Sequence, residues 1–319
     1  MEEQKAGYKD WLEPFGGEWR NRYLYSLYLC MGIVKVVCNL HNYANVGYLK
    51  GYVAHFCYIR WKSFDTMLKV VEMHHDHVSA NCLLRMLADC MAVFRLVYLE
   101  PDEDLCLLRH ELYVIDGCEK NLEVLPEALD LSEETMPEIE LQYYKRQIQG
   151  NRDHRKRLMA EANEILANSP LKEKDEAAFN VIVEKRNWKF KEFKYTKYPK
   201  ENRYNWDELY KMIDRVGKHD EFSFLSQYAH GLSMSNLVIT NKAVDRNSLL
   251  FEGIALLETM IDYMLQFFKD EQFDIFQVFL RPDIQEKLFS CFDEKHRPKA
   301  NEWNAMVFNK LGAITAGKI

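Results

Sequence analysis

The stretch SANCLLRMLADCMAVFRLVYLE, residues 79–100, decides the fold of this chain. Its large apolar residues recur at spacings of three and four, the period of a helix that packs on at least one face. These residues are Leu83, Leu84, Leu87, Met91, Phe94 and Tyr98. Alanine, valine and cysteine make much of the remaining surface apolar, so we expect a central helix. Ser79 suits the N-cap, and Pro101 ends the helix just after Glu100.

Three charged residues interrupt this apolar helix: Arg85, Asp89 and Arg95. Arg85 and Asp89 are four residues apart, which makes them neighbours on the helix surface. A charge inside a buried helix needs a partner. The pattern therefore indicates either a structural ion pair, an exposed edge of the helix, or a polar site that faces a cleft between helices.

The composition predicts an all-α protein with a substantial core. The chain has 319 residues, of which 48% are hydrophobic, enough for one large domain or two coupled ones. Only 13 glycines and 8 prolines accompany long periodic segments, which favours helices. We expect a multi-helix bundle with three parts: an N-terminal helical core over 1–125, a long polar helix and a basic-aromatic extended insertion over 126–204, and C-terminal helices over 205–319 that pack on the core.

Periodicity and capping residues place the other helices. The polar helix is expected over about 138–168, where the apolar stripe is thin. Asn205 with Glu208 resembles a capping box and predicts a helix start. The further expected helices span about 18–41, 46–77, 101–118, 175–186, 219–233 and 248–268, and the chain beyond stays helical to about 291.

Charge and cysteine usage limit the class of protein. The net charge of −7 implies no general attraction to nucleic acid. None of the eight cysteines has CxxC spacing, which predicts reduced core residues in a cytoplasmic protein. The polar start MEEQKAGYKD predicts no signal peptide. The uncharged run Tyr23–Val34 is too short for a bilayer, and Lys35 follows it, so we expect no membrane partner.

No motif for a known cofactor or nucleophile occurs in the sequence: there is no Gly-x-Ser-x-Gly elbow, phosphate loop, dinucleotide fingerprint or zinc pattern. We therefore expect no cofactor. The sequence HHDH at residues 74–77 is the densest metal-like cluster, and Glu72 with His75 forms a Glu-x-x-His pair. Di-iron bundles need two such pairs and two further carboxylates. Glu72 and His75 are thus weak metal candidates, and solvated histidines at a helix end explain the cluster equally well.

Basic and aromatic residues alternate in KRNWKFKEFKYTKYPKENR, residues 185–203. Lysines meet phosphates and aromatic rings stack on bases, so this composition is typical of a surface that binds single-stranded nucleic acid. The residues that we expect to bind are Trp188, Lys189, Lys191, Lys194 and Tyr195. A solvated strand pair with one buried aromatic face explains the same alternation.

A later histidine lies in a serine-rich setting. His230 occurs in QYAHGLSMSN, where a histidine suits a general base or a nucleic-acid ligand. A histidine that caps a helix or bonds between helices is the structural alternative.

Two segments of the chain resemble a known group of proteins. Residues 79–101, SANCLLRMLADCMAVFRLVYLEP, resemble a helix of an uncharacterised family of bacterial helical proteins, in which an Arg or Glu lies in a Leu-rich run. Residues 206–236, WDELYKMIDRVGKHDEFSFLSQYAHGLSMSN, resemble that family's later Tyr-x-x-Leu-Ser-x-x-x-His-Gly-like segment. Such proteins are similar to the HEPN superfamily of helical bundles, several of which are ribonucleases in toxin–antitoxin and phage-defence systems. The resemblance implies a role in RNA processing or phage defence.

The catalytic pattern of HEPN ribonucleases departs from what this chain offers. In that pattern four to six residues lie between an arginine and the histidine that follows it on one helix; the arginine stabilises phosphate and the histidine acts on the ribose 2′-hydroxyl. His230 has no arginine at that distance, and only three residues separate Arg215 from His219. The resemblance then implies a composite site of Arg85, Asp89 and His230, with Asp89 orienting the arginine. The alternative is a non-catalytic helical binding or scaffold protein that associates with itself or a partner protein.

Overall fold

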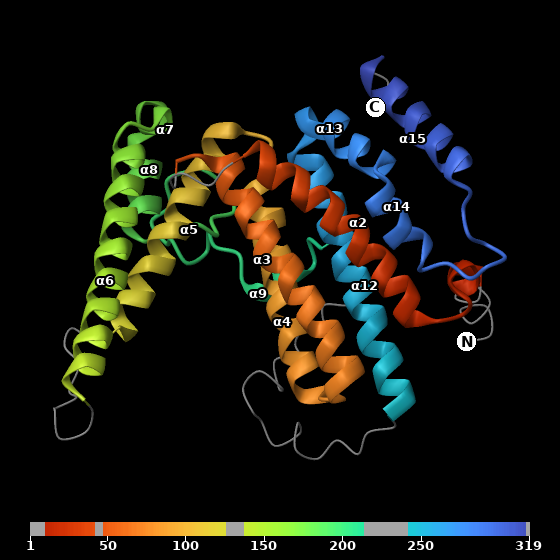
Figure 1. Ribbon diagram of the computed structural model, residues 1–319. Coiled ribbons are helices and arrows are strands. Elements are labelled where there is room, and N and C mark those ends of the chain that lie inside the picture. Colours follow the sequence, from red (N-terminus) through yellow and green to blue (C-terminus); the bar gives the residue numbers. More distant parts are fainter. Residues whose placement is uncertain (1–9, 42–46, 126–136, 214–241, 317–319) are drawn as a thin grey trace. The chain divides into compact units, whose positions relative to one another are not determined.

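The computed structural model describes residues 10–41, 47–125, 137–213 and 242–316, and its regular elements in these ranges are all helical, with no strand among them (Figure 1). The predicted all-α, multi-helix architecture is confirmed. The chain forms two compact units. Unit 1 comprises residues 1–43, 53–99 and 206–319, and unit 2 comprises residues 44–52 and 100–205.

The division differs from the three expected parts: there are two units, and residues 44–52 and 100–125 of the expected N-terminal core belong to unit 2. The end of unit 2 at Asn205 lies one residue from the expected boundary at 204. The segment 100–125, which we expected in the N-terminal core, belongs to unit 2 with the long polar helix. The reason is that the helix in this segment packs along the polar helix.

Unit 1 is built on α2 (Trp19–Leu40), α3 (Leu49–Lys69), α4 (His77–Val93) and α12 (Lys242–Phe267), with the first residues of α3 counted in unit 2. α12 packs against both α2 and α4, as Figure 1 shows. The helix expected to be central is indeed in the core, because Leu84, Leu87 and Met91 are buried. Periodicity therefore placed α4 correctly.

Two π-helical turns flank α4, Val70–His74 before it and Phe94–Tyr98 after it. The predicted helix over residues 79–100 instead begins at His77, and it becomes π-helical from Phe94 onward. The predicted N-cap is also wrong, since Asp76 holds that position and its carboxylate accepts a hydrogen bond from the Ser79 N–H at 3.0 Å. Aspartate is as good an N-cap as serine, and its negative charge also complements the positive helix end.

The rest of unit 1 consists mainly of short helices. They are η1 (Glu13–Phe15), α9 (Trp206–Tyr210), η4 (Lys269–Glu271), α13 (Gln272–Gln277), η5 (Val278–Leu280), α14 (Pro282–Phe289) and α15 (Ala300–Thr315). The last of them was not expected from the sequence. α15 packs on α13, and its buried residues Trp303, Val307 and Leu311 are spaced four apart. The helix expected over 219–233 lies outside the described residues.

Unit 2 contains α5 (Glu103–Val124), α6 (Glu138–Ala167), α7 (Pro170–Lys174) and α8 (Glu176–Glu184). α6 is the predicted long polar helix, and it packs along α5. Asp102 caps α5, since its carboxylate accepts hydrogen bonds from the N–H groups of Asp104 and Leu105 at 3.0 and 3.1 Å. After α8 the chain runs to Asn205 without a regular element, as expected of an extended insertion.

One described helix, α2, is long and apolar enough to cross a membrane by length and composition alone. Half of its most apolar stretch is buried inside the protein. Core helices of soluble proteins have the same length and composition, so this feature is weak support for a membrane role.

Candidate functional site

The charged residues Arg85 and Asp89 of α4 belong to a three-residue cluster with Tyr210. The Arg85 guanidinium forms an ion pair with Asp89 and also contacts the Tyr210 hydroxyl, which in turn contacts Asp89. The Tyr210 ring is buried in the core, and its centre lies 4.6 Å from the guanidinium carbon. Of the alternatives open from the sequence, the geometry favours an ion pair that fixes α9 on α4.

Tyr210 is a member of this cluster that the sequence did not reveal. It follows the predicted capping box by two residues, and Trp206 stacks on its ring at 5.8 Å. His230, the third residue of the expected composite site, lies outside the described residues. The proposed meeting of Arg85 with His230 therefore stays a prediction.

The weak metal candidates Glu72 and His75 bind other parts of the protein. The Glu72 carboxylate accepts two hydrogen bonds from Arg246 at 2.8 and 3.1 Å, and Arg20 lies 3.7 Å away. His75 has a left-handed backbone, and its Nδ1 lies 3.2 Å from the Val71 carbonyl oxygen. Within the described ranges, no group of three or more His, Cys, Asp or Glu side chains is arranged to hold a metal ion.

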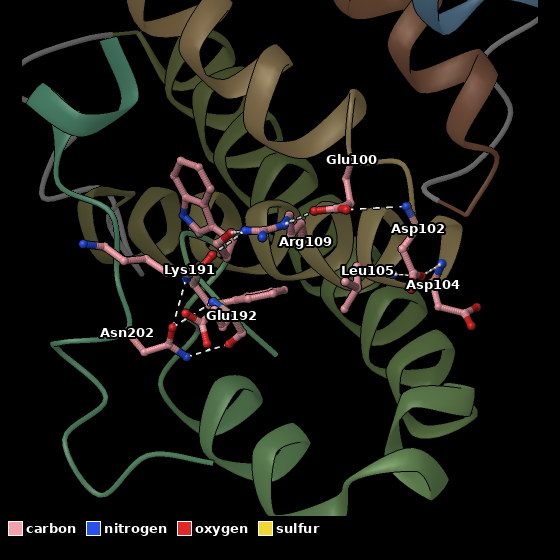
Figure 2. A network of polar contacts seen from close by, with 10 residues as sticks. Glu100, Asp102, Asp104, Leu105, Arg109, Lys191, Glu192 and Asn202 are labelled. Carbon is pink, nitrogen blue, oxygen red and sulfur yellow. Dashed lines mark hydrogen bonds and ion pairs between the residues drawn. The ribbon is translucent and has the colours of Figure 1, made fainter. Parts of the chain in front are cut away.

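The basic-aromatic insertion is a folded loop with a closed base. We call residues 187–204 the Lys/Tyr loop, residues 187–192 with 202–204 its base, and residues 193–201 its tip. Asn202 closes the base: its side-chain oxygen accepts from the N–H groups of Lys191 and Glu192 at 3.1 and 2.9 Å, and its amide donates to the Glu192 carbonyl at 2.7 Å (Figure 2). The Tyr204 N–H also donates to the Lys189 carbonyl at 2.8 Å.

A buried arginine of α5 anchors this base to the rest of unit 2. Arg109 is 3% exposed and donates through Nη1 to the carbonyls of Trp188 and Phe190, at 3.2 and 2.7 Å. Its guanidinium lies 3.8 Å from the Phe190 ring centre, and its Nε lies 3.5 Å from a carboxylate oxygen of Glu100 (Figure 2). Burial lowers the pKa of Arg109, and the Glu100 carboxylate opposes that shift. The arginine thus joins the loop base to Glu100, as Figure 2 shows.

The five predicted nucleic-acid ligands divide between base and tip. Trp188 and Lys189 are buried, and the Trp188 indole N–H donates to the Asp116 carboxylate at 3.1 Å. Lys191 is half-buried, with its Nζ 5.5 Å from the Tyr204 ring centre. Lys194 and Tyr195 are exposed at the tip. Trp188 is therefore not positioned to stack on a nucleobase, because its ring is buried inside unit 2.

The tip itself carries further exposed residues of the same two kinds. Tyr195 and Tyr198 are 58% and 60% exposed. Lys197 and Lys200, which lie near them in the sequence, are exposed as well. Lys194 donates to the Glu192 carboxylate, so part of its charge is compensated. The tip therefore offers two exposed tyrosine side chains among three lysines, and the Lys197 ammonium lies 6.0 Å from the Tyr198 ring centre.

Unit 2 also buries a carboxyl group that the sequence did not mark. Glu111, two residues after Arg109 on α5, is 0% exposed, and neither carboxylate oxygen has a hydrogen-bond partner among the described residues. The sequence does contain an indication that Arg109 and Glu111 are buried: Arg109, His110 and Glu111 are consecutive between apolar segments. Three successive residues cover most of a helix turn, so they cannot all face solvent when both flanks are buried.

Comparison of the chain with protein-family models, with curated proteins and with solved structures yields no match. The resemblance to HEPN proteins accordingly rests on the two sequence segments alone. The geometry of the described residues is therefore the basis for assigning a function.

Proposed function

We propose that this protein binds single-stranded RNA through the tip of the Lys/Tyr loop. The observation that carries the proposal is an anchored base that presents lysines and exposed tyrosines at the tip. Residues 185–203 contain eight basic and two acidic residues, although the whole chain has a net charge of −7. Attraction to a polyanion is thus concentrated in one place.

Each residue type at the tip has a physical role in such binding. Lysines that neutralise phosphates release counterions, which supplies salt-dependent affinity. Tyrosine rings stack on unpaired bases, and stacking tolerates any sequence because every base has a π face. A fixed base lowers the entropy lost when the tip becomes ordered on RNA. The choice of RNA over DNA rests on the resemblance to HEPN proteins. The eight unpaired cysteines support a reducing compartment as the location of the protein.

Substituting the two tip tyrosines should weaken RNA binding strongly. One stacking contact contributes about 1–3 kcal/mol. We expect Tyr195→Ala with Tyr198→Ala to raise the Kd for a fluorescein-labelled, mixed-sequence, 12-nucleotide single-stranded RNA by at least about tenfold. Fluorescence anisotropy measures the Kd.

Substituting three lysines, Lys194, Lys197 and Lys200, by alanine should reduce the slope of log K against log salt by about 2.

Exposed tyrosines elsewhere in unit 2 provide the matched control. Tyr143→Ala with Tyr144→Ala removes rings that are 58% and 46% exposed on α6, and should leave the Kd unchanged. Equal affinity of the tip variants and the parent chain, or no binding of RNA by the parent, would overturn the proposal. Tighter binding of DNA of the same sequence would move the assignment to single-stranded DNA.

A ribonuclease is the second candidate, because the cluster on α4 gathers Arg85, Asp89 and the Tyr210 hydroxyl. During cleavage of a phosphodiester an arginine can stabilise the negative charge on the phosphate, and a neighbouring general acid or base can transfer the proton. The Arg85 side chain is 15% exposed and already paired, which supports a structural role for it over a catalytic one. In the catalytic hypothesis His230 completes the site.

We expect Arg85→Ala to lower the melting temperature by roughly 2–4 °C and to leave RNA affinity intact, because the cluster joins α9 to α4. Differential scanning fluorimetry and anisotropy measure the two effects. RNA cleavage by the parent chain that is lost in both Arg85→Ala and His230→Ala would instead identify a composite ribonuclease site. The variant Asp89→Asn, with the same side-chain shape, should reproduce the stability effect alone.

A further inference from the structure

Glu111 is the most unusual ionisable group in the described part of the chain. It lies in the α5 segment of unit 2, fully buried, with no hydrogen-bond donor for either carboxylate oxygen there. An ionised carboxylate in such a place is strongly unfavourable, and the group takes up a proton instead. No step of RNA binding requires this residue, so its burial needs another explanation.

The groups around Glu111 do nothing to stabilise its negative charge. The neighbouring charge that acts on it is Glu161 of α6, which has the same sign. On α5 itself, Arg109 is directed to the loop base, and the His110 ring packs on Tyr52 at 4.6 Å. α7 also packs on α5, and its charged residues Lys172, Glu173 and Lys174 are all exposed.

The helix that packs along α5 is polar over most of its length. α6 spans 30 residues, and only four of them are buried: Leu141, Arg152, Ala162 and Leu166. Its remaining contacts with α5 include polar ones, such as that of Arg155 with Asn121 at 3.2 Å. None of these contacts supplies a hydrogen bond or an opposite charge to the Glu111 carboxylate, so ionisation of Glu111 has no compensation among the described residues.

We propose that Glu111 is a proton-controlled latch on the α5–α6 pairing, closed when the carboxyl is protonated and loosened when it ionises. This inference is independent of RNA binding. The function of the buried Glu111 carboxyl would be to make the packing of α5 on α6 depend on pH in the neutral range.

The direction of the response is set by proton linkage. Burial and then Glu161 raise the pKa of Glu111 from 4.5 to about 8. Between these values the folded unit binds one more proton than the unfolded chain, so stability falls as pH rises. The contribution of Glu111 is fully present below pH 4.5, declines between 4.5 and 8, and is constant above about 8.

Hydrogen exchange of the full chain, followed by mass spectrometry at pH 6, 7, 8 and 9, tests the latch. Comparing the parent with Glu111→Gln at each pH removes the intrinsic pH dependence of exchange. We expect the exchange rate of α5 and α6 peptides in the parent, relative to the variant, to rise by up to about tenfold per pH unit from 6 to 8 and then level off. Peptides of α2 in unit 1 should show a constant ratio.

Two further variants keep the test decisive. Glu161→Gln retains the latch and removes its neighbouring charge, so the loss of protection should level off at a lower pH even if Glu111→Gln does not fold. Glu164→Gln, an exposed change on the same helix, should match the parent at every pH. A ratio of parent to Glu111→Gln that does not change with pH would overturn the proposal, as would a Glu161→Gln profile identical to that of the parent.

Discussion

Replacing Arg109 with methionine should abolish ordered packing of the Lys/Tyr loop and weaken RNA binding, although Arg109 is buried and lies away from the tip in the sequence. The substitution removes two hydrogen bonds to loop carbonyls and leaves them unsatisfied. It also leaves Glu100 without its buried partner. We expect a loss of about 3 kcal/mol in the free energy of unfolding of unit 2.

Two readouts separate this positioning role from a general loss of structure. Urea unfolding gives the change in stability, and hydrogen exchange of peptides from residues 187–204 reports the loop itself. Arg109→Lys should rescue part of the loop protection, because a lysine keeps the charge but lacks the planar fork that reaches two carbonyls. Arg157→Met on α6, where the side chain is 68% exposed, is the matched control and should change neither quantity. Full loop protection in Arg109→Met would contradict the anchoring role.

The helices were predictable because burial imposes a period on the sequence. The expected helices over 18–41 and 138–168 agree within one or two residues with α2 and α6. Both carry a stripe of apolar residues and end at recognisable residues. α15 escaped prediction because its stripe consists of single residues four apart, with exposed Met306 and Phe308 between them.

The candidate site was less predictable because alternation in sequence does not determine which side of a loop is buried. Trp188, Lys189 and Phe190 are consecutive and all buried, so the apparent basic-aromatic alternation breaks down at the base of the loop. What buries them includes Arg109, which is far away in the sequence. Such a contact becomes evident only when the chain is folded. The exposed tip, in contrast, keeps the composition that was recognised from the sequence.

Gly253→Val should destabilise unit 1 strongly. Gly253 lies within α12, where a glycine costs helix stability and so indicates a close approach of another element. A Cβ atom there would lie 2.7 Å from a ring carbon of Tyr23 and 3.1 Å from the Met67 sulfur. Tyr23 is completely buried, and its hydroxyl donates to the Phe64 carbonyl at 2.9 Å.

The ring of Tyr23 cannot move aside without losing that hydrogen bond, and Phe64 and Met67 beside it are completely buried as well. We expect Gly253→Val to lower the free energy of unfolding by about 3 kcal/mol, measured by urea denaturation. Gly312→Val is the control, since nothing lies within 4 Å of a Cβ at that exposed helical position of unit 1. It should change stability by no more than about 0.5 kcal/mol. Equal effects of the two substitutions would show that α2, α3 and α12 do not meet at Gly253, and the packing that buries α4 would then need revision.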